Sequence, residues 1–386
     1  MTEKLFYADS HMITFSAIVE ACEKVGDYYE AVLSRTAFFP EGGGQYADTG
    51  SIGGVRVLDV QEKKGIIYHK VDGELVVGEE VIGTIDWEER FSKMQNHSGE
   101  HIISGLVHKQ FGYDNVGFHM GKDAITMDFN GVITKEQMKI LEKQANAIVY
   151  QNLDIEILYP TKLELESIEY RSKIEIEGQV RIVRIPDCDV CACCAPHCKK
   201  TGEIGQIKLV GIQNYKGGVR ISMLAGARAL EDHEDKAEQV KRISVLLSAK
   251  EYEVADEVEK LKEELLAKRN KIQELQRMIL KQKVDSMKDG QDVIMMFEAD
   301  LEGNGPRELA NLILAKGTKV AAVFAGTENN YRYVIGSKDT DTREIAKVLN
   351  AKFHGRGGGK PDMVQGSILG DEMSVREEVL ACIKRI

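Results

Sequence analysis

The chain of 386 residues lacks any long hydrophobic run. No apolar stretch approaches the roughly 20 residues that a membrane helix needs, and Met1 to Ser10 lacks the basic and then apolar pattern of an export signal. Positive charge is also scarce, because 62 acidic residues outnumber 51 Lys and Arg and leave a net charge of −11. We therefore expect a cytoplasmic protein with no membrane span and no basic coat for nucleic acid.

Disulfide bonds are not expected either. The seven cysteines are an odd number, and five of them fall within residues 188–198, CDVCACCAPHC. Without an export signal, such a cluster indicates metal ligation or reactive thiols rather than a disulfide framework.

The pattern of the chain predicts a multi-domain α+β protein with four segments. Residues 1–90 contain strand-like runs between Gly and Asp turns, which predicts a small β-barrel-like or sandwich-like domain. Residues 91–228 mix helical and strand patterns. Residues 229–288 are rich in Glu, Lys and Leu and predict a helical coiled-coil linker, and residues 289–386 alternate strands and helices as in a small α/β domain.

Two helices have clear end signals. An apolar stripe from Ile102 to Phe111 is followed by Gly112, which is well placed to end a helix. Thr134 and Gln137 have the spacing of a capping box at the start of a second helix.

The linker carries a seam of apolar residues that alternate four and three apart, interrupted only by Lys268. The seam runs through Val254, Val258, Leu261, Leu265, Ile272, Leu275 and Ile279. Periodicity does not distinguish a helical hairpin within one chain from a contact between two chains, so a homodimer through this seam or the C-terminal domain is possible.

Two pairs of residues have the spacing of metal ligands. His97 and His101, in HSGEH, stand four apart on the predicted helix and project from one face. Cys193 and His197, in the cysteine cluster, also stand four apart. Three nitrogens and one sulfur suit Zn²⁺, so the two pairs predict one zinc site.

A different interpretation starts from the same helix. HSGEH also fits the H-x-x-E-H pattern of inverted zinc proteases, in which Glu100 is the general base and a later glutamate, such as Glu175 or Glu177, is the third ligand. This interpretation leaves Cys193 and His197 without a role.

Five motifs in one order resemble a known family, the long form of the free-standing alanyl-tRNA editing proteins, which look like the editing and C-terminal parts of alanyl-tRNA synthetase. The motifs are RTAFFPEGGGQYADTG, NHSGEH, CCAPHCKKTGEIGQIK, GVRISMLAG and HGRGGGKPDMVQGS, the last similar to the signature of the DHHA1 domain. The resemblance covers nearly the whole chain. It implies zinc at His97, His101, Cys193 and His197.

The resemblance also implies an activity: hydrolysis of the ester that joins a wrong amino acid, serine or possibly glycine, to alanine tRNA. Candidate catalytic or polar contacts are Glu100, beside the metal motif, and Thr36 and Gln45, beside the glycine run. Candidate tRNA-binding residues lie in three stretches: Gly42, Gly43 and Gly44; Lys199 and Lys200; and Gly357, Gly358, Gly359 and Lys360.

The ligand loop departs from the family pattern. Cys194, Ala195 and Pro196 stand where the family usually has two glycines and a threonine, and proline removes a backbone donor. A zinc protein that binds tRNA or another partner without catalysis is therefore a third interpretation.

Overall fold

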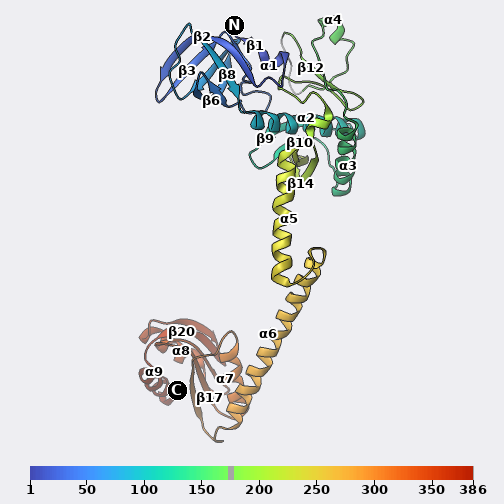
Figure 1. Cartoon of the computed structure of the whole chain (residues 1–386). Helices are drawn as coiled ribbons and strands as arrows, with labels where there is room; N and C mark the ends of the chain where they lie inside the picture. Colours follow the sequence, from blue (N-terminus) through green and yellow to red (C-terminus); the bar gives the residue numbers. More distant parts are fainter. Residues whose placement is uncertain (173–177, 386) are drawn as a thin grey trace. The chain divides into compact units, whose positions relative to one another are not determined.

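The computed structural model describes residues 1–172 and 178–385, which form two compact units (Figure 1). The units span Met1–Arg242 and Ile243–Ile386, and the boundary falls within helix α5, Ala227–Leu247. The mixed α+β, multi-domain organisation that the sequence predicted is confirmed. Among the described residues, no helix is both long enough and apolar enough to cross a membrane.

Six strands of the first unit close into a barrel in the order β2-β3-β7-β6-β5-β8. Alternate side chains enter its core, as in β7, where Ile67, His69 and Val71 are fully buried. The strands are β2 (Thr14–Val25), β3 (Tyr28–Leu33), β5 (Gly50–Ile52), β6 (Val55–Lys63), β7 (Ile66–Val71) and β8 (Glu80–Ile85). Beside them, β1 (Glu3–Lys4) pairs in parallel with β4 (Arg35–Thr36), and α1 (Leu5–Ala8) follows β1.

Helix α2, Trp87–Phe111, joins the barrel to the rest of the first unit. Near its start, the buried Arg90 forms an ion pair with Asp48, which belongs to the segment between β4 and β5. Because a buried charge must be paired, this contact fixes the helix against the glycine-rich segment of the barrel. The helix ends at Gly112, which is left-handed with φ +68°, as the sequence predicted.

The second core of the first unit packs α2 and α3 with a four-stranded sheet in the order β14-β15-β10-β9. The predicted capping box is present, because Thr134 and Gln137 exchange hydrogen bonds at the start of α3. The elements are β9 (Asn115–Met120), β10 (Ile125–Phe129), α3 (Lys135–Gln151), β14 (Ile207–Tyr215) and β15 (Gly218–Ala225). A three-stranded sheet, β11-β12-β13, leads into the cysteine cluster and comprises β11 (Glu156–Leu158), β12 (Ile182–Ile185) and β13 (Asp189–Ala192). Two short helices, α4 (Lys162–Leu165) and η1 (Thr201–Ile204), complete this region.

The second unit contains a five-stranded sheet in the order β16-β17-β18-β20-β19, with helices packed on it (Figure 1). Its β16 and β17 are parallel and its other pairings are antiparallel. The elements are β16 (Val293–Glu298), α7 (Gly305–Ala315), β17 (Val320–Thr327), β18 (Asn330–Ser337), α8 (Thr342–Lys352), β19 (Arg356–Lys360), β20 (Met363–Leu369) and α9 (Glu372–Arg385). The glycine-rich residues Gly357–Gly359 thus lie in the edge strand β19. The sequence pattern did not indicate this strand.

The predicted linker is helical and consists of two helices. Helix α5 ends at Leu247, where Ser248 has a positive φ of +52°, and the turn η2 (Glu251–Glu253) precedes α6, Val254–Asp285. The predicted seam lies along α6. Between Val258 and Ile279 its apolar members are 40% to 63% exposed, so no described part of the chain covers them.

Candidate metal centre

The structure brings together the four residues that the sequence singled out as zinc ligands. His97 and His101 project from α2, and Cys193 and His197 lie in the loop after β13. Their ligand atoms all lie within 4.8 Å of one another. The Cys193 Sγ is 3.5 Å from the His97 Nε2, and the three imidazole rings are each only 2% exposed.

Each histidine has its Nδ1 held by an oxygen atom of a different part of the first unit. The His97 Nδ1 lies 3.0 Å from the Gln45 Oε1, the His101 Nδ1 lies 2.9 Å from the Asp189 Oδ2, and the His197 Nδ1 lies 2.8 Å from the Ala195 carbonyl oxygen. Oxygen acceptors at Nδ1 favour the tautomer with the proton there, which leaves each Nε2 lone pair free. This arrangement is the usual support of metal-bound histidines.

The electrostatics of the site suit a cation. Burial would raise the pKa of the Cys193 thiol, but the charges of His97 and His197 outweigh burial and bring it well below its usual value. Burial would lower the pKa of His101, but hydrogen bonds to Asp189 and Cys193 raise it to about 10. The buried His197 Nε2 has no hydrogen-bond partner among the described residues. A metal ion would satisfy that atom and replace the proton of His101, so the residues fit the predicted zinc.

Of the five clustered thiols, only Cys193 belongs to this ligand set. Burial raises the pKa of Cys188 and Cys198 to about 12 and that of the more exposed Cys194 to about 11. Cys191 forms a second group of metal-type ligands with His101 and Asp189. That group is not independent, because Arg171 donates two hydrogen bonds to Asp189 and His101 donates a third.

The altered ligand loop is held by an arginine that sequence reasoning missed. Arg181, at the start of the strand pair β12–β13, donates from one nitrogen to the carbonyl oxygens of Cys193, at 2.7 Å, and Ala195, at 3.0 Å. The same Ala195 oxygen holds the ring of His197. No spacing rule identifies Arg181, whereas Asp189 at least lies within the cysteine cluster.

The predicted polar residue Gln45 reaches the site from the glycine-rich segment. Gly42 and Gln45 pair through both backbone hydrogen bonds, and Gly43 and Gly44 between them have φ +61° and +81°. This tight turn points the Gln45 side chain at His97. The Gln45 Nε2 is buried and has no partner among the described residues.

The other two predicted catalytic residues are differently placed. Thr36 is fully buried beside the barrel core, where its hydroxyl lies 2.9 Å from the His69 Nε2. Glu100 is buried beside the ligands, accepts hydrogen bonds from Ser104 and Asn115, and lies 3.9 Å from the His101 Nε2.

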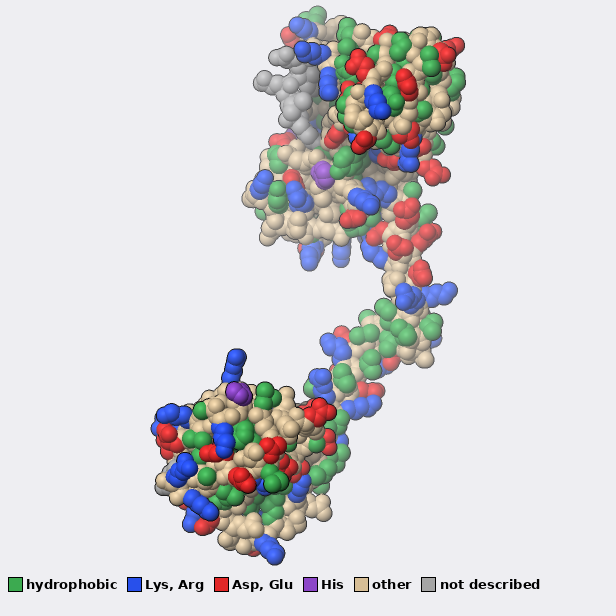
Figure 2. Space-filling view, turned by 90° about the vertical axis from the view of Figure 1, so that its left-hand side faces the viewer, with side chains coloured by type: hydrophobic (Ala, Val, Ile, Leu, Met, Phe, Trp, Pro, Cys, Tyr) green, Lys and Arg blue, Asp and Glu red, His purple; other side chains and the backbone are tan. Residues whose placement is uncertain are grey.

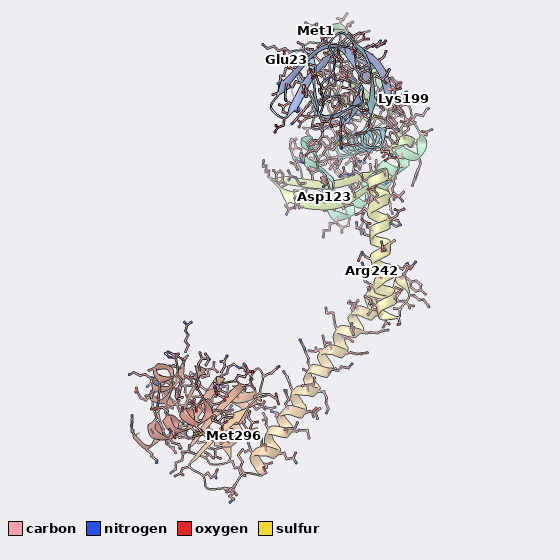
Figure 3. The ribbon with its side chains drawn as sticks, turned by 60° about the vertical axis from the view of Figure 1, so that its left-hand side comes forward. Met1, Glu23, Asp123, Lys199, Arg242 and Met296 are labelled. Atoms are coloured by element: carbon pink, nitrogen blue, oxygen red, sulfur yellow. The ribbon has the colours of Figure 1, made fainter. Side chains whose placement is uncertain are left out.

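The predicted tRNA-binding residues lie in both units. Gly42, Gly43 and Gly44 adjoin the metal centre. Lys199, on the surface in Figure 3, and Lys200 follow the ligand loop and form exposed ion pairs with Asp9 and Asp154. The stretch Gly357–Lys360 is an exposed edge strand of the second unit. On the face shown in Figure 2, basic and acidic side chains are interspersed over both units.

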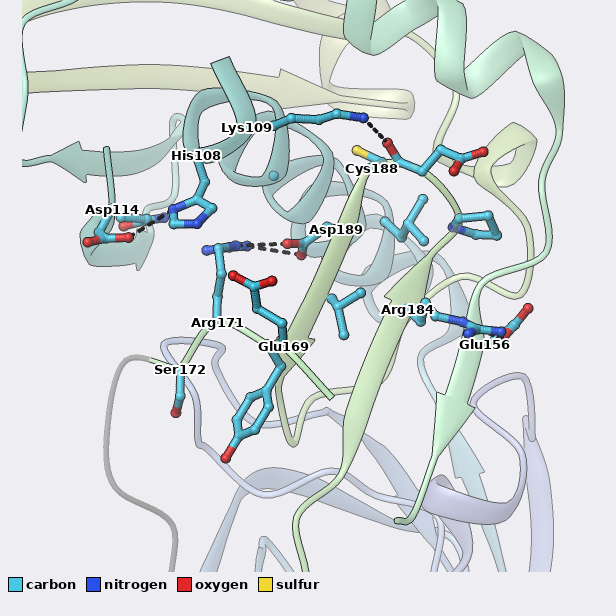
Figure 4. A pocket seen from close by; sticks show the side chains of 17 residues that line it. His108, Lys109, Asp114, Glu156, Glu169, Arg171, Ser172, Arg184, Cys188 and Asp189 are labelled. Carbon is cyan, nitrogen blue, oxygen red and sulfur yellow. Dashed lines mark hydrogen bonds and ion pairs between the residues drawn. The ribbon is translucent and has the colours of Figure 1, made fainter. Parts of the chain in front are cut away.

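A cavity of about 930 Å³ is lined in part by Asp189, the residue that contacts the His101 ring (Figure 4). Its wall includes the Asp189–Arg171 pair, but none of the four ligands lines it. Other contacts in its wall join His108 to Asp114, Lys109 to the Asp187 carbonyl oxygen and Arg184 to Glu156.

Models of known families match three separate parts of the chain. The model of the class II (A) tRNA synthetases matches residues 2–89, that of the threonyl and alanyl tRNA synthetase second additional domain matches residues 180–244, and that of the DHHA1 domain matches residues 290–385.

Two curated relatives align along nearly the whole chain. The alanyl-tRNA editing protein AlaX-L of Pyrococcus horikoshii is 28% identical over 387 residues, which are 95% of each protein. The alanine–tRNA ligase of Halorubrum lacusprofundi is 29% identical over 410 residues, which are 99% of this chain and 44% of the ligase, so the chain spans less than half of that relative.

A solved structure, the C-Ala domain from Aquifex aeolicus alanyl-tRNA synthetase, aligns with 26% of this chain and 96% of its own at 21% identity, but with a TM-score of only 0.22. By the family models, the chain is similar to the second additional domain of threonyl and alanyl tRNA synthetases over residues 180–244 and to the DHHA1 domain over residues 290–385, and it is related along its length to an alanyl-tRNA editing protein, as the order of its motifs predicted.

Proposed function

We propose that the protein is a trans-editing hydrolase that cleaves the aminoacyl ester of mischarged alanine tRNA, Ser-tRNA and possibly Gly-tRNA, at a zinc-containing site. The observation that carries this proposal is the convergence of His97, His101, Cys193 and His197 from two distant motifs. The relative AlaX-L, an alanyl-tRNA editing protein that aligns over 95% of both chains, supports the same activity. Editing of charged tRNA also agrees with the cytoplasmic location expected from the sequence.

Bound zinc supplies a positive centre that can orient the aminoacyl group or polarise a water. A zinc ion with four protein ligands would have no open position for a substrate or a water. A catalytic role would therefore require one ligand to leave or a fifth position to open. Cys193 is the partly exposed member of the set, whereas the three histidines are buried and each is held at its Nδ1.

Gln45 is suited to discriminate serine from alanine. Its buried Nε2 donor has no hydrogen-bond partner among the described residues and lies on the amide that holds His97. A serine hydroxyl accepts a hydrogen bond from this donor, whereas alanine leaves it unpaired, at a cost of about 1–3 kcal/mol. Sites that hydrogen-bond a substrate hydroxyl discriminate strongly against analogues that lack it.

Glu100 is the carboxylate best placed to handle a proton during ester hydrolysis. It lies beside His101 and keeps its orientation through Ser104 and Asn115. Thr36 remains a weaker candidate, because its hydroxyl already contacts His69 and the backbone N–H of Phe38. Lys199 and Lys200 after the ligand loop, and Lys360 with its glycines in the second unit, are the proposed phosphate contacts.

The zinc protease interpretation has less support. Its third ligand would be a glutamate such as Glu175 or Glu177, which lie outside the described residues. The four-ligand cluster needs neither, and the Glu100 side chain is engaged by Ser104 and Asn115.

The proposed function is tested with the purified protein on Ser-, Gly- and Ala-charged alanine tRNA, with zinc content measured in parallel. We expect hydrolysis of Ser-tRNA, and loss of both zinc and activity in Cys193→Ala. Cys191→Ala is the matched control, because that thiol is buried in the same segment but outside the ligand set. If the wild type binds zinc but hydrolyses no charged tRNA faster than buffer, the protein is a binding module. Peptide cleavage that depends on Glu100 but not on Cys193 supports the protease.

The exposed seam of α6 supports a homodimer as a further part of the proposal. The helix packs on α7 through Leu280 and Val284, whereas the seam residues stay exposed. In a parallel pair of helices, Glu257 lies beside Lys262 of the partner subunit, and Glu264 lies beside Arg269 of the partner subunit. In an antiparallel pair, Lys262 instead approaches Arg269 of the partner subunit. The charges therefore favour the parallel dimer.

Charge reversal tests this dimer. We expect Glu257→Lys with Glu264→Lys to shift the protein to monomers in sedimentation experiments, because opposite charges become like charges. Lys262→Glu with Arg269→Glu should have the same effect, and a mixture of the two variants should form a heterodimer. A wild type that stays monomeric throughout contradicts the dimer.

A further inference from the structure

Two exposed aromatic side chains meet at the rim of the metal centre. The rings of Tyr46, which is 46% exposed, and His119 lie edge to face with centroids 6.0 Å apart. Neither ring forms a hydrogen bond within residues 1–172 and 178–385. Since exposed rings gain little from burial, the pair has no evident role in stabilising the fold.

The sequence neighbours of both rings contact a metal ligand. Gln45, beside Tyr46, is bonded to His97. Phe118 precedes His119 in the sequence, and the centroids of the Phe118 and His97 rings are 5.0 Å apart. Tyr46 and His119 are therefore each adjacent in the sequence to a residue that contacts His97.

The segments that carry the two rings are joined to each other. The Met120 N–H of β9 donates to the Gly44 carbonyl oxygen at 3.3 Å. A Cβ atom on Gly44 would lie 2.6 Å from the Phe118 ring, so the glycine lets the turn sit directly on the strand. The aromatic pair is thus carried by two segments that are hydrogen-bonded to each other and closely packed.

This rim is also the exposed side of the metal centre. The three histidines are buried, whereas Gly43, Gly44 and Cys194 are exposed. Gly43 and Cys194 are neighbours, because a Cβ atom on Gly43 would lie 3.2 Å from the Cys194 Sγ. The turn that carries Tyr46 therefore meets the ligand loop at the protein surface.

We propose that Tyr46 and His119 form a stacking platform for an adenine base at the 3′ end of an RNA strand. The inference rests on the proposed function, in which the aminoacyl ester lies at the metal centre and the terminal base, always adenine in tRNA, lies within a few ångströms of it. Base stacking on an aromatic side chain contributes about 1–3 kcal/mol per base. The platform holds the base and leaves the chemistry of the ester to the buried groups.

Kinetics with Ser-charged tRNA test the platform. We expect Tyr46→Ala and His119→Ala each to raise KM about 5- to 100-fold with kcat largely unchanged, the range that corresponds to the stacking free energy. Tyr46→Phe should retain the wild-type KM, because the ring remains. Tyr150→Ala, which removes a 79% exposed tyrosine of α3, is the matched control and should have no effect. A KM within twofold of wild type in both alanine variants of the pair overturns the inference.

A binding experiment separates failure of the platform from failure of the proposed function. The probes are the trinucleotide CCA and the same trinucleotide with an abasic 3′ residue, titrated into the zinc-loaded protein. We expect wild type to bind CCA more tightly than the abasic probe, and Tyr46→Ala to bind both equally. This difference is measurable even if no charged tRNA is hydrolysed, in which case the platform stands and the hydrolase fails. If wild type does not distinguish the probes, the platform is wrong whatever the activity.

Discussion

The chain contains two runs of three glycines, Gly42–Gly44 in the first unit and Gly357–Gly359 in the second, and the structure uses them in opposite ways. The first run is a tight turn in which Gly43 and Gly44 are left-handed. The second run is extended and forms the middle of the edge strand β19. The same three-glycine run therefore meets both a conformational and a steric need in the first unit, and a steric need alone in the second.

In the first run, backbone conformation and space both require glycine. Residues with a Cβ atom are disfavoured at φ +81°, and at Gly44 the added atom would also meet the Phe118 ring. The turn in return positions Gln45 beside His97.

In the second run, only space requires glycine. A Cβ atom on Gly357 would lie 2.5 Å from the Gln365 carbonyl oxygen of β20, whereas one on Gly358 would meet nothing within 4 Å. The difference shows that a glycine run by itself does not identify a ligand loop, because close packing of strands also selects glycine.

The largest expected effect comes from Gly44→Val, which breaks the first run. A branched side chain is strained at a positive φ and overlaps Phe118, so Gln45 loses its position beside His97. We expect Ser-tRNA hydrolysis to fall by about 100-fold or more, roughly 3 kcal/mol of transition-state stabilisation. Gly54→Val is the matched control, because Gly54 has φ +88° but open space around it. Equal loss of activity in both variants would show that the contact with Phe118 is irrelevant.

Gly357→Ala should have the next largest effect, and on stability rather than on the metal centre. The methyl group pushes β19 away from β20, with an expected cost of about 1–3 kcal/mol. Thermal unfolding should report a lower melting temperature, while zinc content stays at the wild-type level. Loss of zinc in this variant would contradict the separate roles of the two runs.

Lys360→Ala tests whether the second run also contacts tRNA. Removal of one phosphate contact should weaken tRNA binding several-fold and reduce the slope of log affinity against log salt by about 1. Binding is measured at several salt concentrations with Lys338→Ala, another exposed lysine of the same unit, as control. If the two variants have the same slope as wild type, Lys360 makes no phosphate contact.

Gly358→Ala should have the smallest effect. Its added methyl group enters open space in an extended strand, so the free energy of unfolding should change by no more than about 0.5 kcal/mol. A change as large as that of Gly357→Ala, measured by the same unfolding experiment, would mean that the second run also depends on glycine conformation.

Much of the local structure followed from the sequence. Gly112 ends α2 and the Thr134–Gln137 pair caps α3, because each signal acts through neighbouring backbone groups. The strands and helices of the second unit also follow their patterns, except β19 and β20. A glycine stretch carries no side-chain alternation, and its pairing with β20 depends on neighbours that the pattern does not contain.

The supports of the candidate metal centre were only partly predictable. Gln45 was found through its motif, whereas Asp189, Arg171 and Arg181 were not. Asp189 holds His101 and is held by Arg171, and Arg181 holds the ligand loop. These contacts join residues without a regular spacing, so no periodic rule could identify them.

The sequence alone determined the two halves of the metal centre. Spacing four apart places His97 and His101 on one face of a helix, and the same spacing selects Cys193 and His197 among five cysteines and one histidine. Only the tertiary structure brought Cys193 within 3.5 Å of His97 across 96 residues of sequence. The reason is physical: helical periodicity is a local property of the backbone, whereas the approach of the two halves depends on how α2 packs against the segment that contains β13 and the loop after it.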